Sequence, residues 1–262
     1  MANAQVSLMT YLQHSPQAIP VIYNGQSTKN TTNQAYNWEN IGTTQHWADF
    51  SIQGVQQRFG QLLQAALIPD DAFPGSPPQP IVSEDLVRYR IAEYISPRVR
   101  RALRSGFHFL SQTGGMGDDQ SIIGIDAGGA ASHIGNFAPD LAFFNMTEEA
   151  TQRPNRAPGD IKPSFKWSSG LANSPRQSHF QEYMQALSQV NYYMIQHQAR
   201  YGYLLTNQEL VAIRRIDADG NLELATPIPW TATGTADAPQ MTVLLGLWYL
   251  GMLASDNTNW QL

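Results

Sequence analysis

Two aspartates and one lysine interrupt apolar stretches near the middle of the chain. Asp140 precedes the apolar run 141–144, and Asp160 and Lys162 flank Ile161. Because side chains along a β-strand alternate between faces, Asp160 and Lys162 share one face while Ile161 points to the other. If the strand that contains residues 141–144 pairs with the strand that contains residues 160–162, Asp140 lies close to Asp160 and Lys162. Two carboxylates beside an ammonium group can form a divalent-cation site with a charge-stabilising lysine.

The elements before this motif are predicted to be mainly helical. Residues 51–67 have apolar side chains at helical spacing and form an amphipathic helix that Pro69 ends. Residues 83–103 form a second helix with Ser83 as its N-cap. Residues 1–50, rich in Gln, Asn and Thr, are expected to be a loosely structured arm with a few anchoring aromatics. The Pro-rich stretch 74–80 is a predicted linker.

The motif itself and the elements after it predict a sheet with helices. The glycine-rich stretch 114–119 is expected to be a hairpin-type turn. Strands are predicted at 121–126, 139–146, 160–167, 203–206, 210–216 and 222–224, and helices at 178–200 and 239–255. This order indicates an α/β or α+β mixed sheet with helices on its faces, the last helix being almost wholly apolar and buried.

Composition restricts the class of protein. The 262-residue chain is 42% hydrophobic and 14% charged, and it contains no cysteine. The absence of cysteine excludes a disulfide scaffold and a thiolate metal site. No secretory signal is recognisable in residues 1–20, and the longest apolar run, 241–254, is too short and too interrupted to span a membrane. We expect an intracellular protein, cytoplasmic or nuclear, without a membrane partner.

The charge distribution bears on the partners. The net charge is −5, and lysine occurs only at positions 29, 162 and 166. This balance is unfavourable for strong non-specific binding to duplex nucleic acid. The arginines cluster between Arg88 and Arg104 on the second predicted helix. They could form a solvated face that suits the helix dipole, or they could contact phosphate.

The sequence resembles the PD-(D/E)XK nuclease-like superfamily, with Pro139-Asp140 as the PD and Asp160-Ile161-Lys162 as the D-x-K. It is most similar to the uncharacterised PD-(D/E)XK nuclease-like domain of fungal proteins. The resemblance implies a restriction-endonuclease-like core of helix, three-strand meander, helix and strand. Residues 83–216 follow that order, so we expect an N-terminal extension at 1–80 and a nuclease-like domain at 81–262 that ends in the buried helix.

The resemblance also implies roles for the motif residues. Asp140 and Asp160, with the main-chain carbonyl of Ile161, would be ligands of Mg2+ or Mn2+. Lys162 would stabilise charge on the scissile phosphate or help to lower the pKa of the attacking water. The alternative is structural, because short D-x-K matches are frequent by chance. In that case Asp140 is a turn residue, and Asp160 and Lys162 form an ion pair at a strand edge.

Two further parts of the sequence resemble family elements. Members commonly carry an acidic residue on the helix before the meander, and Glu84 is the first candidate here, with Glu93 the second. Gln189 and Tyr193 match the Q-x-x-x-Y element of the exonuclease-like branch. Because they are four residues apart, they share a helix face. The resemblance implies that this face points towards the metal.

Three functions remain open. The first is a metal-dependent nuclease that hydrolyses DNA or RNA by attack of activated water. The second is a repurposed enzyme that uses Asp140, Asp160 and Lys162 as acid/base groups on a small biosynthetic substrate. The third is a non-catalytic interaction module, which the intact set of motif residues disfavours. A basic groove would favour the first, and a closed apolar pocket the second.

Overall fold

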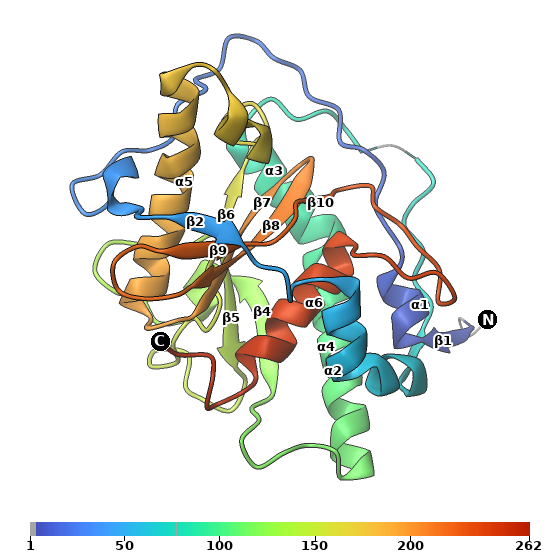
Figure 1. Ribbon diagram of the computed structural model, residues 1–262. Coiled ribbons are helices and arrows are strands. Elements are labelled where there is room, and N and C mark those ends of the chain that lie inside the picture. Colours follow the sequence, from blue (N-terminus) through green and yellow to red (C-terminus); the bar gives the residue numbers. More distant parts are fainter. Residues whose placement is uncertain (1–3, 77) are drawn as a thin grey trace.

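A mixed β-sheet forms the centre of the molecule in the computed structural model, which describes residues 4–76 and 78–262 (Figure 1). Seven strands run in the order β2-β9-β8-β7-β6-β5-β4, and β10 pairs with β8. The strand bounds are Thr44–His46 (β2), Ile123–Ala127 (β4), Leu141–Asn145 (β5), Gly159–Lys162 (β6), Tyr201–Thr206 (β7), Glu209–Arg215 (β8), Leu222–Leu224 (β9) and Ile228–Pro229 (β10).

The motif strands β5 and β6 are interior strands near the β4 edge of this sheet. Strands β4, β5 and β6 form an antiparallel meander, as expected. Helix α5 (Gln177–Gln196) then crosses over to β7, which pairs parallel to β6. A parallel pair needs such a long connection, whereas the antiparallel hairpin β7–β8 needs only a tight turn. The predicted mixed sheet with helices is confirmed.

Helices cover both faces of the sheet (Figure 1). Helices α4 (Ser96–Thr113) and α6 (Val243–Ala254) pack into the larger core with side chains of β4, β5 and β7. Helix α5 packs on the opposite face in a second core with Leu204, Val211 and Ile213. All 12 residues of α6 are buried, as its composition predicted. None of the described helices combines the length and the apolar character needed to cross a membrane.

The predicted helix over 83–103 is wrong in its extent. It is two helices, α3 (Glu84–Tyr94) and α4, with a break at Ile95 because Pro97 begins the new helix. Helix α4 continues to Thr113 and ends at Gly114, whose φ of 69° is the left-handed conformation that favours glycine. The stretch 114–119 therefore follows the end of a helix, and the prediction of a hairpin-type turn there was wrong.

The N-terminal region is more ordered than predicted. Strand β1 (Gln5–Ser7) pairs with β3 (Leu67–Pro69), and β2 extends the main sheet parallel to β9. The apolar side chains of helix α1 (Leu8–Leu12) are fully buried against helix α2 (Ile52–Ala65) and α4, so the loosely structured arm expected for residues 1–50 was wrong for α1 and the two strands. It is confirmed for residues 13–37, which contain only isolated β-bridges and include the buried aromatic Tyr36. Short 3-10 helices occupy Trp38–Asn40 (η1), Gly128–Ala130 (η2) and Ser169–Asn173 (η3). Residues 1–3 of that arm and residue 77 of the predicted linker lie outside the described residues.

Strand β6 also requires a glycine next to the motif. A Cβ atom at Gly159 would lie 2.1 Å from the ring of Tyr203, which is fully buried on the neighbouring strand β7. We predict that Gly159→Ala lowers the free energy of unfolding by about 1–3 kcal/mol or more, because a packed core cannot accommodate the extra atom. Urea unfolding measures this, with Gly75→Ala as the control, since nothing lies within 4 Å of its Cβ. Equal effects of the two substitutions would contradict the prediction.

Candidate active site

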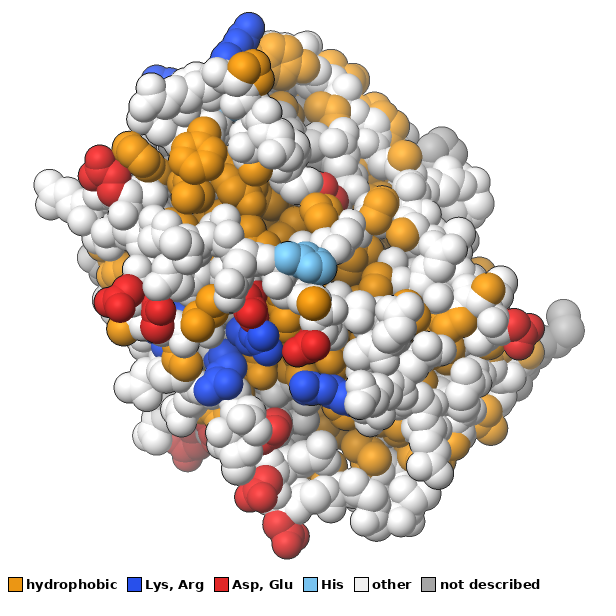
Figure 2. All heavy atoms as spheres, viewed as in Figure 1, with side chains coloured by type: hydrophobic (Ala, Val, Ile, Leu, Met, Phe, Trp, Pro, Cys, Tyr) orange, Lys and Arg blue, Asp and Glu red, His pale blue; other side chains and the backbone are white. Residues whose placement is uncertain are grey.

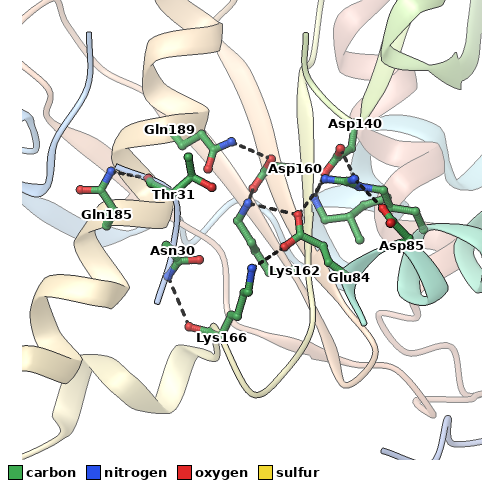
Figure 3. Close-up of polar contacts among 12 residues, drawn as sticks. Asn30, Thr31, Glu84, Asp85, Asp140, Asp160, Lys162, Lys166, Gln185 and Gln189 are labelled. Carbon is green, nitrogen blue, oxygen red and sulfur yellow. Dashed lines mark hydrogen bonds and ion pairs between the residues drawn. The ribbon is translucent and has the colours of Figure 1, made fainter. Parts of the chain in front are cut away.

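The motif side chains converge from four separate elements (Figure 3). The set consists of Asp140 just before β5, Asp160 and Lys162 on β6, Glu84 and Arg88 on α3, Lys166 after β6, and Gln189 and Tyr193 on α5. Three of these side chains are carboxylates and three are cations. The result is a cluster of opposite charges at one side of the sheet.

Strand β6 contributes an ion pair. The Nζ atom of Lys162 lies 2.7 Å from Oδ2 of Asp160, and each of the two side chains is only 3% exposed. Ile161 points to the opposite face and packs in the larger core. The alternation expected from the sequence is therefore observed, and the two charged side chains share a face.

Asp140 holds β5 and β6 together where their backbone pairing is short. The register of the two strands contains the single pair Leu141 and Gly159. Next to it, the backbone N–H of Ile161 donates to Oδ2 of Asp140 at 2.8 Å. The other carboxylate oxygen of Asp140 lies 2.8 Å from Nε of Arg88. Asp140 thus continues the strand pairing with its side chain and also faces the helix.

Glu84 is the helix acid that reaches the cluster. Ser83 caps α3 as predicted, accepting from the N–H of Leu86 at 3.4 Å. Glu84 then accepts from Arg88 at 2.7 Å and from Lys166 at 2.9 Å, and its Oε1 lies 3.9 Å from Nζ of Lys162.

The second candidate for this helix acid lies elsewhere. Glu93 is exposed and pairs with Arg90, at 3.0 Å. It has no contact with Asp140, Asp160 or Lys162, so the cluster takes its helix carboxylate from Glu84.

The pair Gln189 and Tyr193 faces the motif from α5. The side-chain amide of Gln189 donates to Oδ1 of Asp160 at 3.2 Å and to the hydroxyl of Tyr193 at 3.0 Å. Both residues are buried. The carbonyl oxygen of Gln189 is buried too, and it has no hydrogen-bond partner among the described residues. A buried acceptor of this kind is unfavourable unless a further donor satisfies it.

The N-terminal segment closes one side of the cluster. Asn30 is buried, and its side-chain amide donates to the main-chain carbonyl of Lys166 at 3.3 Å. One turn before Gln189 on α5, Gln185 donates to the carbonyl of Thr31 at 2.9 Å (Figure 3). The segment that contains Asn30 and Thr31 therefore forms part of the site wall.

Burial controls the ionisation of the carboxylates. Burial and the neighbouring charge of Asp160 raise the pKa of Asp140 to about 7, although Arg88 and the Ile161 N–H act in the opposite direction. Burial also raises the pKa of Asp160, even with Lys162 beside it. The pKa of Lys162 is raised, because the attraction of Asp160 and Glu84 exceeds the effect of burial. Burial therefore disfavours ionisation of both aspartates, and at Asp140 the charge of Asp160 adds to this effect. Lys162 stays protonated.

The donor set fits a divalent cation bound through two carboxylates. Mg2+ typically uses one or two carboxylates and retains several waters. Asp140 and Asp160 repel one another, and a cation between them would remove the repulsion that raises the pKa of Asp140. Within residues 4–76 and 78–262, no group of three His, Cys, Asp or Glu side chains has the arrangement of a metal site. Any ion would therefore rely on the aspartate pair and would compete with Arg88 and Lys162 for its oxygens.

Two cluster residues were not predicted to be part of the site. Arg88 was grouped with the other helix arginines, although its position four residues after Glu84 was a signal for an ion pair. Lys166 was expected within the predicted strand 160–167. The strand stops at Lys162, and a turn closed by the Lys166 N–H and the Pro163 carbonyl, 2.8 Å apart, brings Lys166 back to Glu84.

Comparison with protein families, characterised proteins and solved structures gave no match. Membership of the PD-(D/E)XK superfamily and the restriction-endonuclease-like core are therefore proposals, supported by the motif and by the geometry described above.

The raised pKa of Asp140 gives a pH-dependent prediction. Between its ordinary value of 3.8 and about 7, the folded state retains a proton that the unfolded state has lost. The contribution of Asp140 to stability must then fall as pH rises through this window. We predict that Asp140→Asn gains stability relative to the wild type from pH 4.5 to pH 8, by on the order of a few kcal/mol.

Urea unfolding at a series of pH values measures this difference. The control is Asp118→Asn, which alters an exposed aspartate in the turn after α4. Its stability should follow the wild type across the range. Parallel curves for Asp140→Asn and the wild type would contradict the prediction.

Proposed function

We propose that this cluster is the active site of a metal-dependent phosphodiesterase of the PD-(D/E)XK type, acting on DNA or RNA. The observation that carries the proposal is the convergence of Asp140, Asp160 and Lys162 with a helix carboxylate, Glu84. They come from three separate segments and lie within one network of ion pairs and hydrogen bonds. A chance D-x-K match would give a local ion pair and would not require the helix acid or the α5 glutamine.

Each residue has a role in such a site. Asp140 and Asp160, with the carbonyl of Ile161, would hold Mg2+ or Mn2+, and Glu84 beside them binds Arg88 and Lys166. Once bound, the ion would polarise a phosphate oxygen and lower the pKa of a coordinated water. Lys162 would stabilise the charge that develops on the phosphate.

The α5 residues would position polar groups around the reacting centre. Gln189 already donates to Asp160, which fixes the orientation of that carboxylate. Its free carbonyl oxygen could accept a hydrogen bond from a water or from the substrate. Burial and the charge of Asp160 raise the pKa of Tyr193 far above its ordinary value, so its hydroxyl stays protonated.

A second function is favoured by the burial of the reacting groups. Asp160 and Lys162 are both buried, and the protein carries a net charge of −5. On the face that Figure 2 shows, the basic side chains near the centre lie among acidic ones. A duplex would find little basic surface there. A small substrate could reach the same carboxylates for acid/base chemistry, and this repurposed enzyme is the alternative.

Loss of the lysine should slow catalysis strongly in a variant that circular dichroism shows to be folded, although the buried Asp160 loses its partner and the variant is less stable. We predict that Lys162→Met lowers the rate of Mg2+- or Mn2+-dependent cleavage by about 100-fold or more, because a buried stabilising charge is removed. The assay uses single- and double-stranded DNA and RNA. Lys29→Met, which alters an exposed lysine, is the control and should cleave as the wild type does. The nuclease proposal fails if the wild type shows no metal-dependent cleavage, or if the variant cleaves equally well.

Arg88 should weaken metal binding. Its guanidinium contacts Asp140 at 2.8 Å and Glu84 at 2.7 Å, so it neutralises one proposed ligand and the carboxylate beside it. We predict that Arg88→Ala binds Mn2+ about tenfold more tightly than the wild type, because an opposing charge is removed. Isothermal titration calorimetry measures the affinity.

The matched control is Arg90→Ala, on the same helix. Arg90 also pairs with an acidic residue three positions on, but it lies outside the cluster. Its variant should bind Mn2+ with wild-type affinity. Weaker or unchanged binding by Arg88→Ala would show that Arg88 does not compete with the ion.

A further inference from the structure

A groove lies between helix α4 and the edge strand β4, which run beside one another (Figure 1). It encloses about 560 Å3, a volume typical of small-molecule sites. Its lining includes none of the residues of the candidate active site. The function proposed above therefore leaves this groove unexplained.

One wall of the groove presents polar groups that have no partner. Arg104, His108 and Ser111 follow one another at spacings of four and three residues, so they share a face of α4. All three are exposed, and none has a side-chain hydrogen bond or ion pair within the described part of the chain. They offer a guanidinium, an imidazole and a hydroxyl, all able to donate to an anionic group.

The other wall is apolar. Ile122 and Met146 are 42% and 50% exposed, large values for side chains of this type. The base between the walls consists of buried apolar residues, among them Phe107 and Ile125. An apolar group placed against this wall would bury surface that is now in contact with water.

The side chains of the other two arginines of the groove already have contacts within the protein. Arg100 lies 2.9 Å from Asp126, the one acidic residue of the lining, and also donates to the carbonyl of Ile125 at 3.1 Å. Arg153 donates to the carbonyl of Ala130, and its guanidinium lies 3.7 Å from the ring centroid of Phe144. No carboxylate of the lining balances the charge of Arg104 or Arg153, so the groove is complementary to an anion.

An added β-strand is not a suitable occupant. Such a partner would need access to the outer edge of β4. Ile123 and Ile125 of that strand are only 2% and 1% exposed, and the side chain of Arg100 already donates a hydrogen bond to the Ile125 carbonyl. The edge is covered by α4, and the accessible surface is made of side chains.

We propose that the α4–β4 groove binds a small organic anion with an apolar body. The apolar body packs against Ile122 and Met146, and a carboxylate or phosphate head group contacts Arg104 and His108. This site is separate from the carboxylate cluster, and it does not depend on the function proposed for that cluster.

Calorimetric titration with three probes of equal chain length tests the proposal. Decanoate and decyl phosphate carry the two possible head groups, and decylammonium carries the opposite charge. We expect saturable binding of one or both anions at one site per chain and no binding of decylammonium. The tighter anion identifies the head group. Binding of decylammonium equal to that of the anions, or no binding of either anion, would overturn the proposal.

Two variants locate the site. Arg104→Ser should weaken binding of the anion about tenfold or more, because a charge-assisted hydrogen bond is lost. Met146→Glu should weaken it similarly by placing a negative charge on the apolar wall. Arg58→Ser removes an exposed arginine from α2 and should bind as the wild type does. All these residues are exposed, and circular dichroism checks that each variant is folded. Equal weakening by Arg58→Ser, or none by Arg104→Ser and Met146→Glu, would contradict the assignment.

Discussion

The buried ion pair between Asp160 and Lys162 is the constraint on which the rest of the structure depends. Removing two charges from water is unfavourable unless each is paired and hydrogen-bonded, and losing one partner of such a pair typically costs about 3–5 kcal/mol. Here the pair lies on a central strand, 3% exposed. The surrounding elements supply what it needs: a second carboxylate from α3 near Lys162, and the Gln189 amide from α5 beside Asp160.

The same constraint explains why the cluster contains as many cations as carboxylates. Glu84, Asp140 and Asp160 are opposed by Arg88, Lys162 and Lys166. The balance is uneven within the cluster. Glu84 lies near all three cations, which lower its pKa against the effect of burial. Asp140 has one direct cationic partner, which does not offset burial and the charge of Asp160. The poorly compensated carboxylate is thus the one where an additional cation would act most strongly.

Part of this arrangement could be predicted from the sequence, because it follows from local rules. Strand alternation placed Asp160 and Lys162 together, and helix periodicity placed Gln189 with Tyr193. The Ser83 cap identified the start of α3 and with it Glu84. What could not be predicted depends on tertiary packing. The contact of Arg88 with Asp140 joins residues 52 positions apart, and the burial of α1 depends on partners distant in the sequence. Pro97 signalled the break between α3 and α4, but one continuous helix was predicted there.

The central claim is that Asp140 and Asp160 together form a divalent-cation site. Anomalous diffraction from crystals equilibrated with Mn2+ tests it most directly, because it locates the ion without relying on turnover or on a known substrate. The account predicts one strong peak within coordination distance of a carboxylate oxygen of each aspartate. It also predicts that the peak disappears in Asp160→Asn. A peak elsewhere, or none at saturating Mn2+, would contradict the account and leave the cluster as a structural ion-pair network.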